Sequence, residues 1–189
     1  MIYCIIGMSG TGKTTIAREV SKKTKVPIIV SYTSRPKRQG EEDYVDYNFV
    51  DNNYFDDNFD DFLDIRQYTV ADGSVWKYGY KKSDFKDKDK DYIIVIDTTG
   101  YATFKEYFGS EQLQPILIES RLDELYKRAE IRGDDPKELK RRLLDDEQKI
   151  EDFKKTENYK LVYNYYELNF AVIQVVRILV KGEKKKNGK

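Results

Sequence analysis

The sequence predicts an α/β fold with a mostly parallel central sheet and a small antiparallel insert in the middle of the chain. Short runs rich in β-branched residues alternate with helical patterns, which is typical of βαβ units. The middle of the chain differs, because its apolar residues are mainly aromatic. The chain has 189 residues, and since one domain typically has about 150 residues we expect a single domain.

Five strands and four helices are expected outside the middle segment. Apolar, mostly β-branched runs predict strands over residues 2–6, 26–30, 92–96, 116–118 and 161–163. Apolar residues at helical spacing predict helices over residues 13–23, 122–131, 136–153 and 167–180. Pro136 supports the start of the third helix, because proline is tolerated in a first turn.

The middle segment, residues 44–80, predicts the antiparallel insert. The turn signal Asp72-Gly73 lies between the alternating stretches 66–70 and 75–80, as in a β-hairpin. Residues 51–64 predict a helix with a solvated acidic face, since phenylalanines stand at helical spacing at Phe55, Phe59 and Phe62. A calcium-binding EF-hand loop is excluded there, because its template requires Gly and Glu where Asp61 and Gln67 stand.

Composition excludes several classes of protein. The chain contains no histidine, so it cannot build a Ser-His-Asp triad, a Cys-His pair or a histidine-ligated zinc site. Because 34 Lys and Arg balance 34 Asp and Glu, no net field recruits nucleic acid or an anionic membrane. The single cysteine, Cys4, is expected to be a buried thiol in a reducing compartment.

No segment is expected to cross a membrane. No cationic leader precedes an apolar segment at the N-terminus, and the longest apolar stretch, residues 170–180, is interrupted and too short. The basic residues 181–189 are expected to form a disordered, solvated tail. We therefore expect a cytoplasmic protein, a monomer or homodimer, without membrane or nucleic-acid partners.

A phosphate-binding motif follows the first expected strand. Residues 7–14 match G-x-x-x-x-G-K-[ST] in full and lead into a helix. The glycines let backbone N–H groups face phosphate oxygens, Lys13 reaches the β- and γ-phosphates, and the Thr14 hydroxyl can ligate Mg²⁺. ATP and Mg²⁺ are the expected cofactors. The expected ATP-binding residues here are Ser9, Gly10, Thr11, Gly12, Lys13, Thr14 and Thr15.

Two further elements fit a kinase, although the motif alone does not choose among motors, GTPases and small-molecule kinases. Asp97 follows the strand at 92–96, at the end of a parallel strand where a carboxylate can approach a metal. A second group, Arg35, Arg38 and Tyr47, suits a dianionic phosphate, because guanidinium groups bind phosphate oxygens bidentately.

In this order the motifs resemble those of the guanylate kinase family. The P-loop at 7–14, the Arg-x-x-Arg-x-Gly-Glu stretch at 35–41 and the Asp-Tyr-x-Phe pattern at 46–49 carry the resemblance, which spans about residues 1–167. It implies the three-layer fold of P-loop nucleoside monophosphate (NMP) kinases and phosphorylation of GMP or dGMP with ATP. The implied regions are a core at 1–30, 91–130 and 153–180, an NMP-binding region at 31–90, and a lid with its return helix at 131–152.

The resemblance also implies roles for individual residues. Three would act on the transferring phosphoryl group: Lys13, Arg132 and Arg142. Arg128 would contact ATP. The implied substrate-binding residues are Ser31, Arg35, Arg38, Tyr47, Asp64, Tyr78 and Asp97, and the implied metal ligands are Thr14 and Asp97. Residues 131–140 would close as a lid that excludes water.

The sequence departs from the family pattern where the base is read. Asp64 replaces a longer Glu, Tyr80 replaces Ser or Thr after Tyr-Gly, and the loop before Tyr78 is longer. These changes alter the reach and the volume of the pocket, on which base selection depends. Three alternatives therefore stay open: an NMP kinase of different or broad base specificity, a non-catalytic guanylate kinase-like binding module, and a P-loop kinase of another small metabolite.

Overall fold

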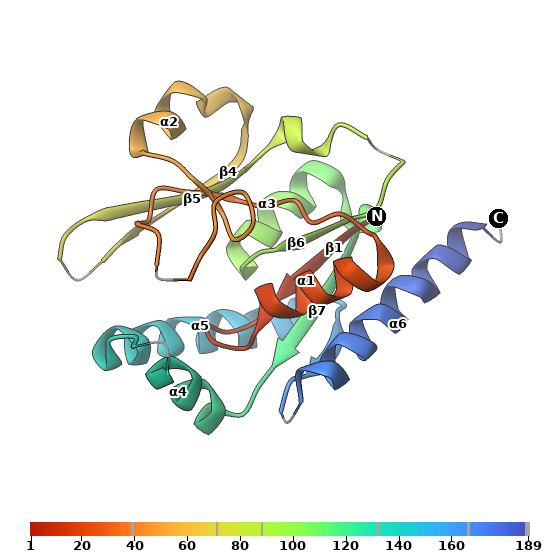
Figure 1. Ribbon diagram of the computed structural model, residues 1–189. Coiled ribbons are helices and arrows are strands. Elements are labelled where there is room, and N and C mark those ends of the chain that lie inside the picture. The colour runs from red at the N-terminus through yellow and green to blue at the C-terminus, as the bar shows by residue number, and fades with distance from the viewer. Residues whose placement is uncertain (39, 71, 88, 132, 166, 188–189) are drawn as a thin grey trace.

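The computed structural model describes residues 1–38, 40–70, 72–87, 89–131, 133–165 and 167–187. Its central sheet consists of four strands in the order β6 (Tyr92–Val95), β1 (Ile2–Ile6), β7 (Leu113–Glu119) and β8 (Lys160–Tyr163). All three neighbouring pairs are parallel. The predicted parallel sheet is thus confirmed, and it forms the middle layer of the molecule (Figure 1).

Helices cover both faces of the central sheet. The helices of the core and lid are α1 (Lys13–Thr24), α3 (Thr98–Phe108), α4 (Leu122–Ile131), α5 (Pro136–Thr156) and α6 (Leu168–Asn187). Tyr3 and Ile5 of β1 pack against α1 and α6, whereas Cys4 and Ile6 pack against α3 and α5. Successive side chains of a strand point to opposite faces, so a strand buried along its whole length supplies both layers.

A second, smaller sheet lies above the central one in Figure 1. Its strands follow the order β3 (Asn48–Phe49), β2 (Tyr32–Thr33), β5 (Val75–Lys81) and β4 (Phe62–Thr69). The strands β4 and β5 form the antiparallel hairpin that the Asp72-Gly73 turn predicts, whereas β2 and β3 pair in parallel. The insert is therefore confirmed.

The strand predicted over residues 26–30 is wrong. This segment lies beside β6, but it makes only an isolated bridge between Ile28 and Ile93. The Pro27 carbonyl accepts a hydrogen bond from the Ile93 N–H over 2.9 Å. Proline has no N–H with which to extend the ladder, so regular pairing stops there.

The helix predicted within residues 51–64 is shorter than expected. The structure contains α2 (Asn52–Asp57), capped by the Asp51 carboxylate, which accepts from the Tyr54 N–H over 2.8 Å. Phe55 is buried in this helix, whereas Phe59 is 66% exposed and Phe62 belongs to β4. Pairing of Phe62 with Lys81 in the hairpin outweighs the helical spacing of the three rings.

The last helix is longer than predicted. α6 continues to Asn187, whereas the sequence predicted a disordered tail from residue 181. Lys and Glu are good helix formers, and cations near a helix C-terminus interact favourably with its dipole. In the described part of the chain, no helix is long and apolar enough to span a membrane.

A helical hairpin of α4 and α5 lies next to the P-loop (Figure 1), and the segment 131–152, expected to be a lid with its return helix, includes most of α5. The core of the hairpin is a small cluster against which Met8 of the P-loop packs, made of Leu125, Ala129, Leu139 and Leu143. Arg132, between the two helices, lies outside the described residues.

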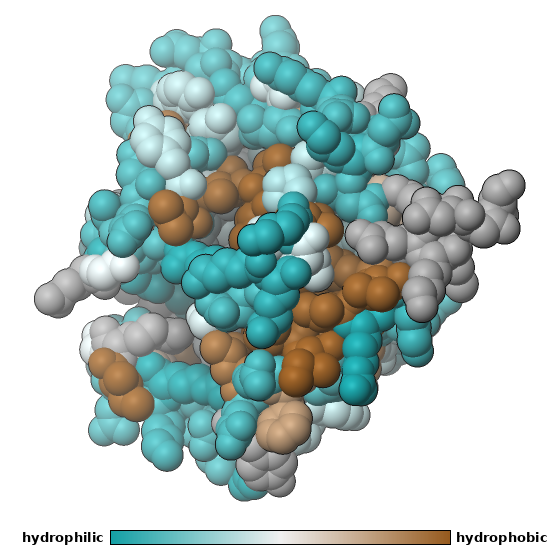
Figure 2. Space-filling model, turned by 45° about the vertical axis from the view of Figure 1, so that its right-hand side comes forward, coloured by the Kyte–Doolittle hydropathy of each residue, from teal (hydrophilic) through white to brown (hydrophobic). Residues whose placement is uncertain are grey.

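The face in Figure 2 is mostly hydrophilic, with hydrophobic side chains gathered near its middle.

Candidate active site

The P-loop adopts the backbone that its glycines predict. Gly12 has φ +87°, and a Cβ there would lie 2.8 Å from the Asn164 Nδ2 atom. Only glycine fits this left-handed, closely approached position. The same Asn164 amide donates to the Thr11 carbonyl over 2.9 Å, so the segment after β8 supports the loop.

Lys13 and helix α5 converge on this loop. The Lys13 ammonium donates to the carbonyls of Gly7 and Met8 over 2.8 and 2.9 Å. On the other side, the Ser9 N–H donates to the Asp146 carboxylate of α5 over 2.6 Å. An anionic oxygen therefore lies on a P-loop N–H donor, the kind of contact that backbone N–H groups also make with phosphate oxygens.

Three other predicted ATP-binding residues take different positions around the loop. Arg128 of α4 donates to the Gly10 carbonyl over 3.4 Å and to the Asn164 carbonyl over 3.2 Å, so it lies beside the P-loop as predicted. Thr14 is half-buried in the first turn of α1, whereas Thr15 is exposed to solvent. These positions leave Arg128 and Thr14 better placed than Thr15 for contact with a nucleotide.

A cavity of about 250 Å³ extends from the P-loop to the hairpin of the insert. Its lining from the core and lid includes Gly7, Ser9, Lys13, Asp97, Arg141, Arg142, Asp145 and Asp146. Its lining from the insert includes Ser31, Arg38, Tyr47, Arg66, Tyr68, Val70, Trp76 and Tyr78. The fold thus brings the predicted phosphate-donor and phosphate-acceptor residues to one space.

Arg142 of α5 lies at the junction of these two groups. Its Nη2 atom donates to the Ser9 hydroxyl over 3.0 Å. Arg142 and Arg141 both line the cavity beside Lys13. Three cationic side chains therefore line the part of the cavity next to the P-loop.

The two predicted acceptor arginines differ in their roles. Arg38 lines the cavity with Tyr47 and Tyr78. Arg35 does not line it, because its buried guanidinium donates to both carboxylate oxygens of Glu41 over 2.7 and 2.9 Å. Glu41 also accepts from the Arg38 N–H over 2.8 Å. In this structure Arg35 therefore supports the loop that carries Arg38, contrary to the expectation that both arginines face the phosphate.

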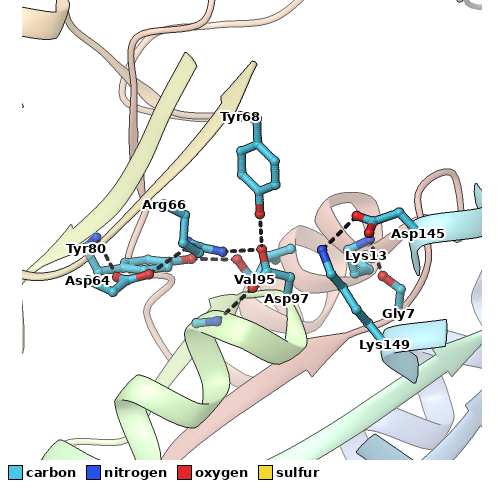
Figure 3. Close-up of polar contacts among 11 residues, drawn as sticks. Gly7, Lys13, Asp64, Arg66, Tyr68, Tyr80, Val95, Asp97, Asp145 and Lys149 are labelled. Atoms are coloured by element: carbon cyan, nitrogen blue, oxygen red, sulfur yellow. Dashed lines mark hydrogen bonds and ion pairs between the residues drawn. The ribbon is translucent and has the colours of Figure 1, made fainter. Parts of the chain in front are cut away.

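A buried network joins the insert to the core beside the cavity (Figure 3). The Arg66 guanidinium lies between two carboxylates: its Nε is 2.7 Å from Asp64 Oδ2 and its Nη1 donates to Asp97 Oδ2 over 2.7 Å. The Tyr68 hydroxyl donates to the same Asp97 oxygen over 2.7 Å, and the Gly100 N–H donates to Asp97 Oδ1 over 2.8 Å. Asp97 thus both caps the N-terminus of α3 and holds β4 against it.

The two carboxyl groups of this network have different acidities. Burial acts to raise the pKa of Asp97, but Arg66, the Gly100 N–H and the Tyr68 hydroxyl outweigh it and lower that pKa below its ordinary value. Burial raises the pKa of Asp64, although Arg66 and the Tyr80 N–H oppose this. Burial and the nearby Asp97 raise the pKa of Tyr68, so its hydroxyl remains a donor at neutral pH.

Two positions expected at the base do not reach the cavity. Asp64 is 7% exposed, pairs with Arg66 and accepts from the Tyr80 N–H over 3.1 Å. Tyr80 is 1% exposed, and its hydroxyl donates to the Val95 carbonyl over 2.7 Å. Neither lines the cavity, so the prediction that Asp64 contacts the substrate finds no support in this geometry. The physical reason is that Arg66 outcompetes an external donor for the Asp64 carboxylate.

Sequence reasoning missed several residues that line the cavity, among them Arg66, Tyr68, Trp76 and Arg141. Alternation along a strand could have found the first three. Tyr78, which was assigned to the site, pairs with Arg66, and Tyr68 pairs with Trp76, so these residues share one face of the hairpin. Arg141 stands next to the predicted Arg142 on α5, but helical periodicity alone did not place it.

The two predicted metal ligands fit Mg²⁺ unequally. Thr14 is half-buried and lies in the first turn of α1 directly after Lys13, the place from which a P-loop threonine hydroxyl contacts a nucleotide-bound metal. Both Asp97 oxygens already accept hydrogen bonds, and one of them lies 2.7 Å from a guanidinium nitrogen that would repel a cation. Among the described residues, no group of three or more acidic or cysteine side chains could hold a metal ion. Thr14, together with nucleotide phosphates, is the better match.

The fold and this site together define a P-loop protein with the α/β architecture of the kinases. Residues 4–158 match a family model described as an AAA domain, a class of P-loop domains. The chain is 31% identical to a guanylate kinase of Hydrogenovibrio crunogenus over 173 residues, which cover 88% of this chain and 81% of that protein. A guanylate kinase of Fusobacterium nucleatum is 28% identical, with 97% of both chains covered.

The chain belongs to the guanylate kinase family. A solved structure supports the same architecture: the crystal structure of guanylate kinase from Anaplasma phagocytophilum has a TM-score of 0.74 at 22% identity, covering 96% of this chain and 85% of that one. A crystal structure of an uncharacterized protein from Eubacterium ventriosum has a TM-score of 0.51 at 13% identity. At these identities the two structures show a shared fold.

Proposed function

We propose that this protein transfers the γ-phosphoryl group of ATP to the phosphate of GMP or dGMP. The observation that carries the proposal is the single cavity lined at one end by Gly7, Ser9 and Lys13 of the P-loop and at the other by Arg38 and Tyr78. Such a cavity suits two phosphate groups that must meet. Relatives named guanylate kinase, one of them 31% identical, support the choice of acceptor.

The composition of the chain suits this reaction. A phosphate oxygen of the acceptor is already an anionic nucleophile, so its attack on the γ-phosphorus, with release of ADP, needs no general base. A chain without histidine can therefore catalyse it. Catalysis then depends on holding two phosphates in line and on neutralising the charge that develops between them.

The residues divide this work between the two phosphates. Lys13 and Arg142 would stabilise the transferring group, and Arg132, outside the described residues, is proposed to help them. Arg38, Tyr47 and Tyr78 would hold the acceptor phosphate, with Ser31 nearby. When bound with ATP, Mg²⁺ supplies neutralisation of the β- and γ-phosphates, and the Thr14 hydroxyl would hold it.

The same proposal assigns parts of the fold. Residues 31–90 form the acceptor region, and residues 131–152 form a lid and return helix that excludes water from the cavity. We further propose that the protein acts in the cytoplasm as a monomer or homodimer, without nucleic-acid partners. The buried thiol of Cys4, whose pKa is raised by burial, suits a reducing compartment.

The test is a coupled ADP-release assay with ATP, Mg²⁺ and each of GMP, dGMP, AMP, CMP, UMP and dTMP. The expected result is turnover with GMP and dGMP that stops when EDTA removes the metal. ATP binding without turnover of any acceptor would overturn the proposal and favour a binding module.

A different base specificity is the second candidate, and one observation favours it. Asp64 and Tyr80, which stand at base-reading positions, do not line the cavity. Turnover of CMP, UMP or AMP well above that of GMP in the same assay would support this candidate.

A further inference from the structure

Arg66 of β4 lies in the cavity wall between the carboxylates of Asp64 and Asp97 (Figure 3). We infer that Arg66 selects the base of the acceptor nucleotide by donating hydrogen bonds to acceptor atoms on the base, which for guanine are O6 and N7. The inference deepens the proposed kinase function and rests on it, because it concerns the acceptor of that reaction.

Arg66 forms ion pairs with the two carboxylates of this network, Asp64 and Asp97. Guanine presents donors at N1 and at its 2-amino group, and a carboxylate would have to accept from them. Asp64 Oδ2 lies 2.7 Å from Arg66 Nε, and Asp97 Oδ2 accepts from Arg66 Nη1 over 2.7 Å. Asp64 is buried away from the cavity, whereas Asp97 lines it and shares its Oδ2 with Arg66 and Tyr68. The guanidinium therefore adds N–H donors to the cavity wall beside Asp97.

The position of Arg66 is fixed from several sides. Tyr68 donates to the same Asp97 oxygen, which holds β4 against the N-terminus of α3. A Cβ at Gly100 would lie 3.1 Å from Arg66 Cζ, so the glycine in this first helical turn leaves room for the guanidinium. The side-chain exposure of Arg66 is only 13%. A rigid guanidinium loses little entropy when it binds a ligand.

Arg66 keeps donors for a ligand. A guanidinium carries five N–H groups and no acceptor. Within the described part of the chain, Arg66 donates one hydrogen bond, from Nη1 to Asp97, and its side chain lines the cavity. Arginine pairs bidentately with O6 and N7 of guanine, which explains how this pocket could still select guanine.

The neighbours of Arg66 suit a base rather than a phosphate. Tyr68, Val70 and Trp76 line the same part of the hairpin face, and Arg66 pairs across the hairpin with Tyr78, which belongs to the acceptor site. Aromatic and apolar side chains pack against the faces of a planar ring. A base placed there would meet rings on its faces and the guanidinium on its edge.

The first experiment uses the unaltered protein and three acceptors: GMP, inosine monophosphate, which lacks the 2-amino donor, and 7-deaza-GMP, which lacks the N7 acceptor. We expect kcat/KM for inosine monophosphate within about threefold of GMP, and a loss of about tenfold for 7-deaza-GMP, because one hydrogen bond of the pair is missing. A large loss with inosine monophosphate and none with 7-deaza-GMP would overturn the inference, since it would mean that Asp64 and Asp97 read the donor edge.

The second experiment compares Arg66→Lys with Arg177→Lys, a matched control on the exposed face of α6 outside the cavity lining. Arg66→Lys keeps a positive charge between the carboxylates but removes the planar guanidinium donors that can form two parallel hydrogen bonds. We expect the ratio of kcat/KM between the best acceptor and the next one to fall by about tenfold, with KM for ATP unchanged and a melting curve that remains cooperative. An unchanged ratio would overturn the inference.

The two proposals fail in different ways. If no acceptor is turned over, the proposed kinase function fails, and the inference fails with it. If an acceptor other than GMP is preferred, the selection of guanine fails. The effect of Arg66→Lys on the ratio of kcat/KM between the two best acceptors then decides whether Arg66 selects the base. If GMP is used but neither the analogues nor Arg66→Lys behave as expected, only the inference fails.

Discussion

The P-loop and the opposite wall of the cavity, around Arg66, are built in different ways. The P-loop is one continuous segment whose donors come from its own backbone, with Lys13 folded onto its carbonyls. The cavity wall around Arg66 is assembled from the β4–β5 hairpin and the N-terminus of α3, which are separated in sequence. The geometry of the P-loop therefore depends on neighbours in sequence, whereas the position of Arg66 depends on carboxylates contributed by β4 and by the start of α3.

The largest expected effect breaks the P-loop side of this comparison. Lys13→Met should lower kcat by about 10²–10³-fold, because it removes a cation from the transferring phosphoryl group. Steady-state ADP release measures the effect, and Lys23→Met, on the exposed end of α1, is the matched control. A loss of less than threefold would contradict the role of Lys13.

The next effect separates the acceptor phosphate from ATP. Arg38→Met should lower kcat/KM for the acceptor by about 10²-fold, since a charge-assisted contact is worth about 1.5–3 kcal/mol, while KM for ATP stays nearly constant. Lys37→Met, an exposed neighbour, is the control. Equal losses for both substrates would show that Arg38 does not belong to the acceptor site alone.

A smaller effect tests the contact between helix α5 and the P-loop. Asp146→Asn should lower KM for ATP by about threefold, because the Asp146 carboxylate lies on the Ser9 N–H and its negative charge opposes phosphate there. Initial rates at varied ATP measure this, with the exposed Glu147→Gln as control. A higher KM for ATP would mean that Asp146 supports the loop instead of competing for it.

The smallest effect concerns stability at the cavity wall around Arg66. The pKa of Asp97 is lowered in the folded protein, so its ionised form stabilises the fold above the ordinary pKa of an aspartate, and this contribution is lost as pH falls through the folded pKa. Asp97→Asn should therefore lower Tm at pH 7 by about 2–4 °C. The Tm difference should shrink as pH falls below about 4. A constant difference across this range would contradict the assignment.

Local patterns predicted those parts of the fold that depend on neighbours in sequence. The run 2–6 is apolar at every position and is a strand buried on both faces. The Asp72-Gly73 turn depends on Gly73 and on the Asp72 carboxylate, which accepts from the Ser74 N–H and hydroxyl. The patterns failed where pairing partners decided the outcome. Phe62 stands at helical spacing but pairs in β4, and residues 26–30 resemble a strand but meet β6 through a proline.

The same division holds for the site. Lys13, Arg38, Tyr47, Tyr78 and Arg142 line the cavity as their motifs predicted. Arg35 and Asp64 do not, because each pairs with an oppositely charged side chain whose position depends on how the loop or the hairpin folds. No spacing rule indicates which of two nearby arginines will be buried against a glutamate.

By itself, the sequence determined the parallel core sheet, the phosphate-binding loop and the absence of histidine chemistry, because these depend on residue type and on spacing over a few positions. Only the tertiary structure decided that Arg66 lies between Asp64 and Asp97, that Asp146 contacts the P-loop, and that the two phosphate sites share one cavity. These facts depend on contacts between elements far apart in the chain, where burial, charge and competition among donors select one pairing from several.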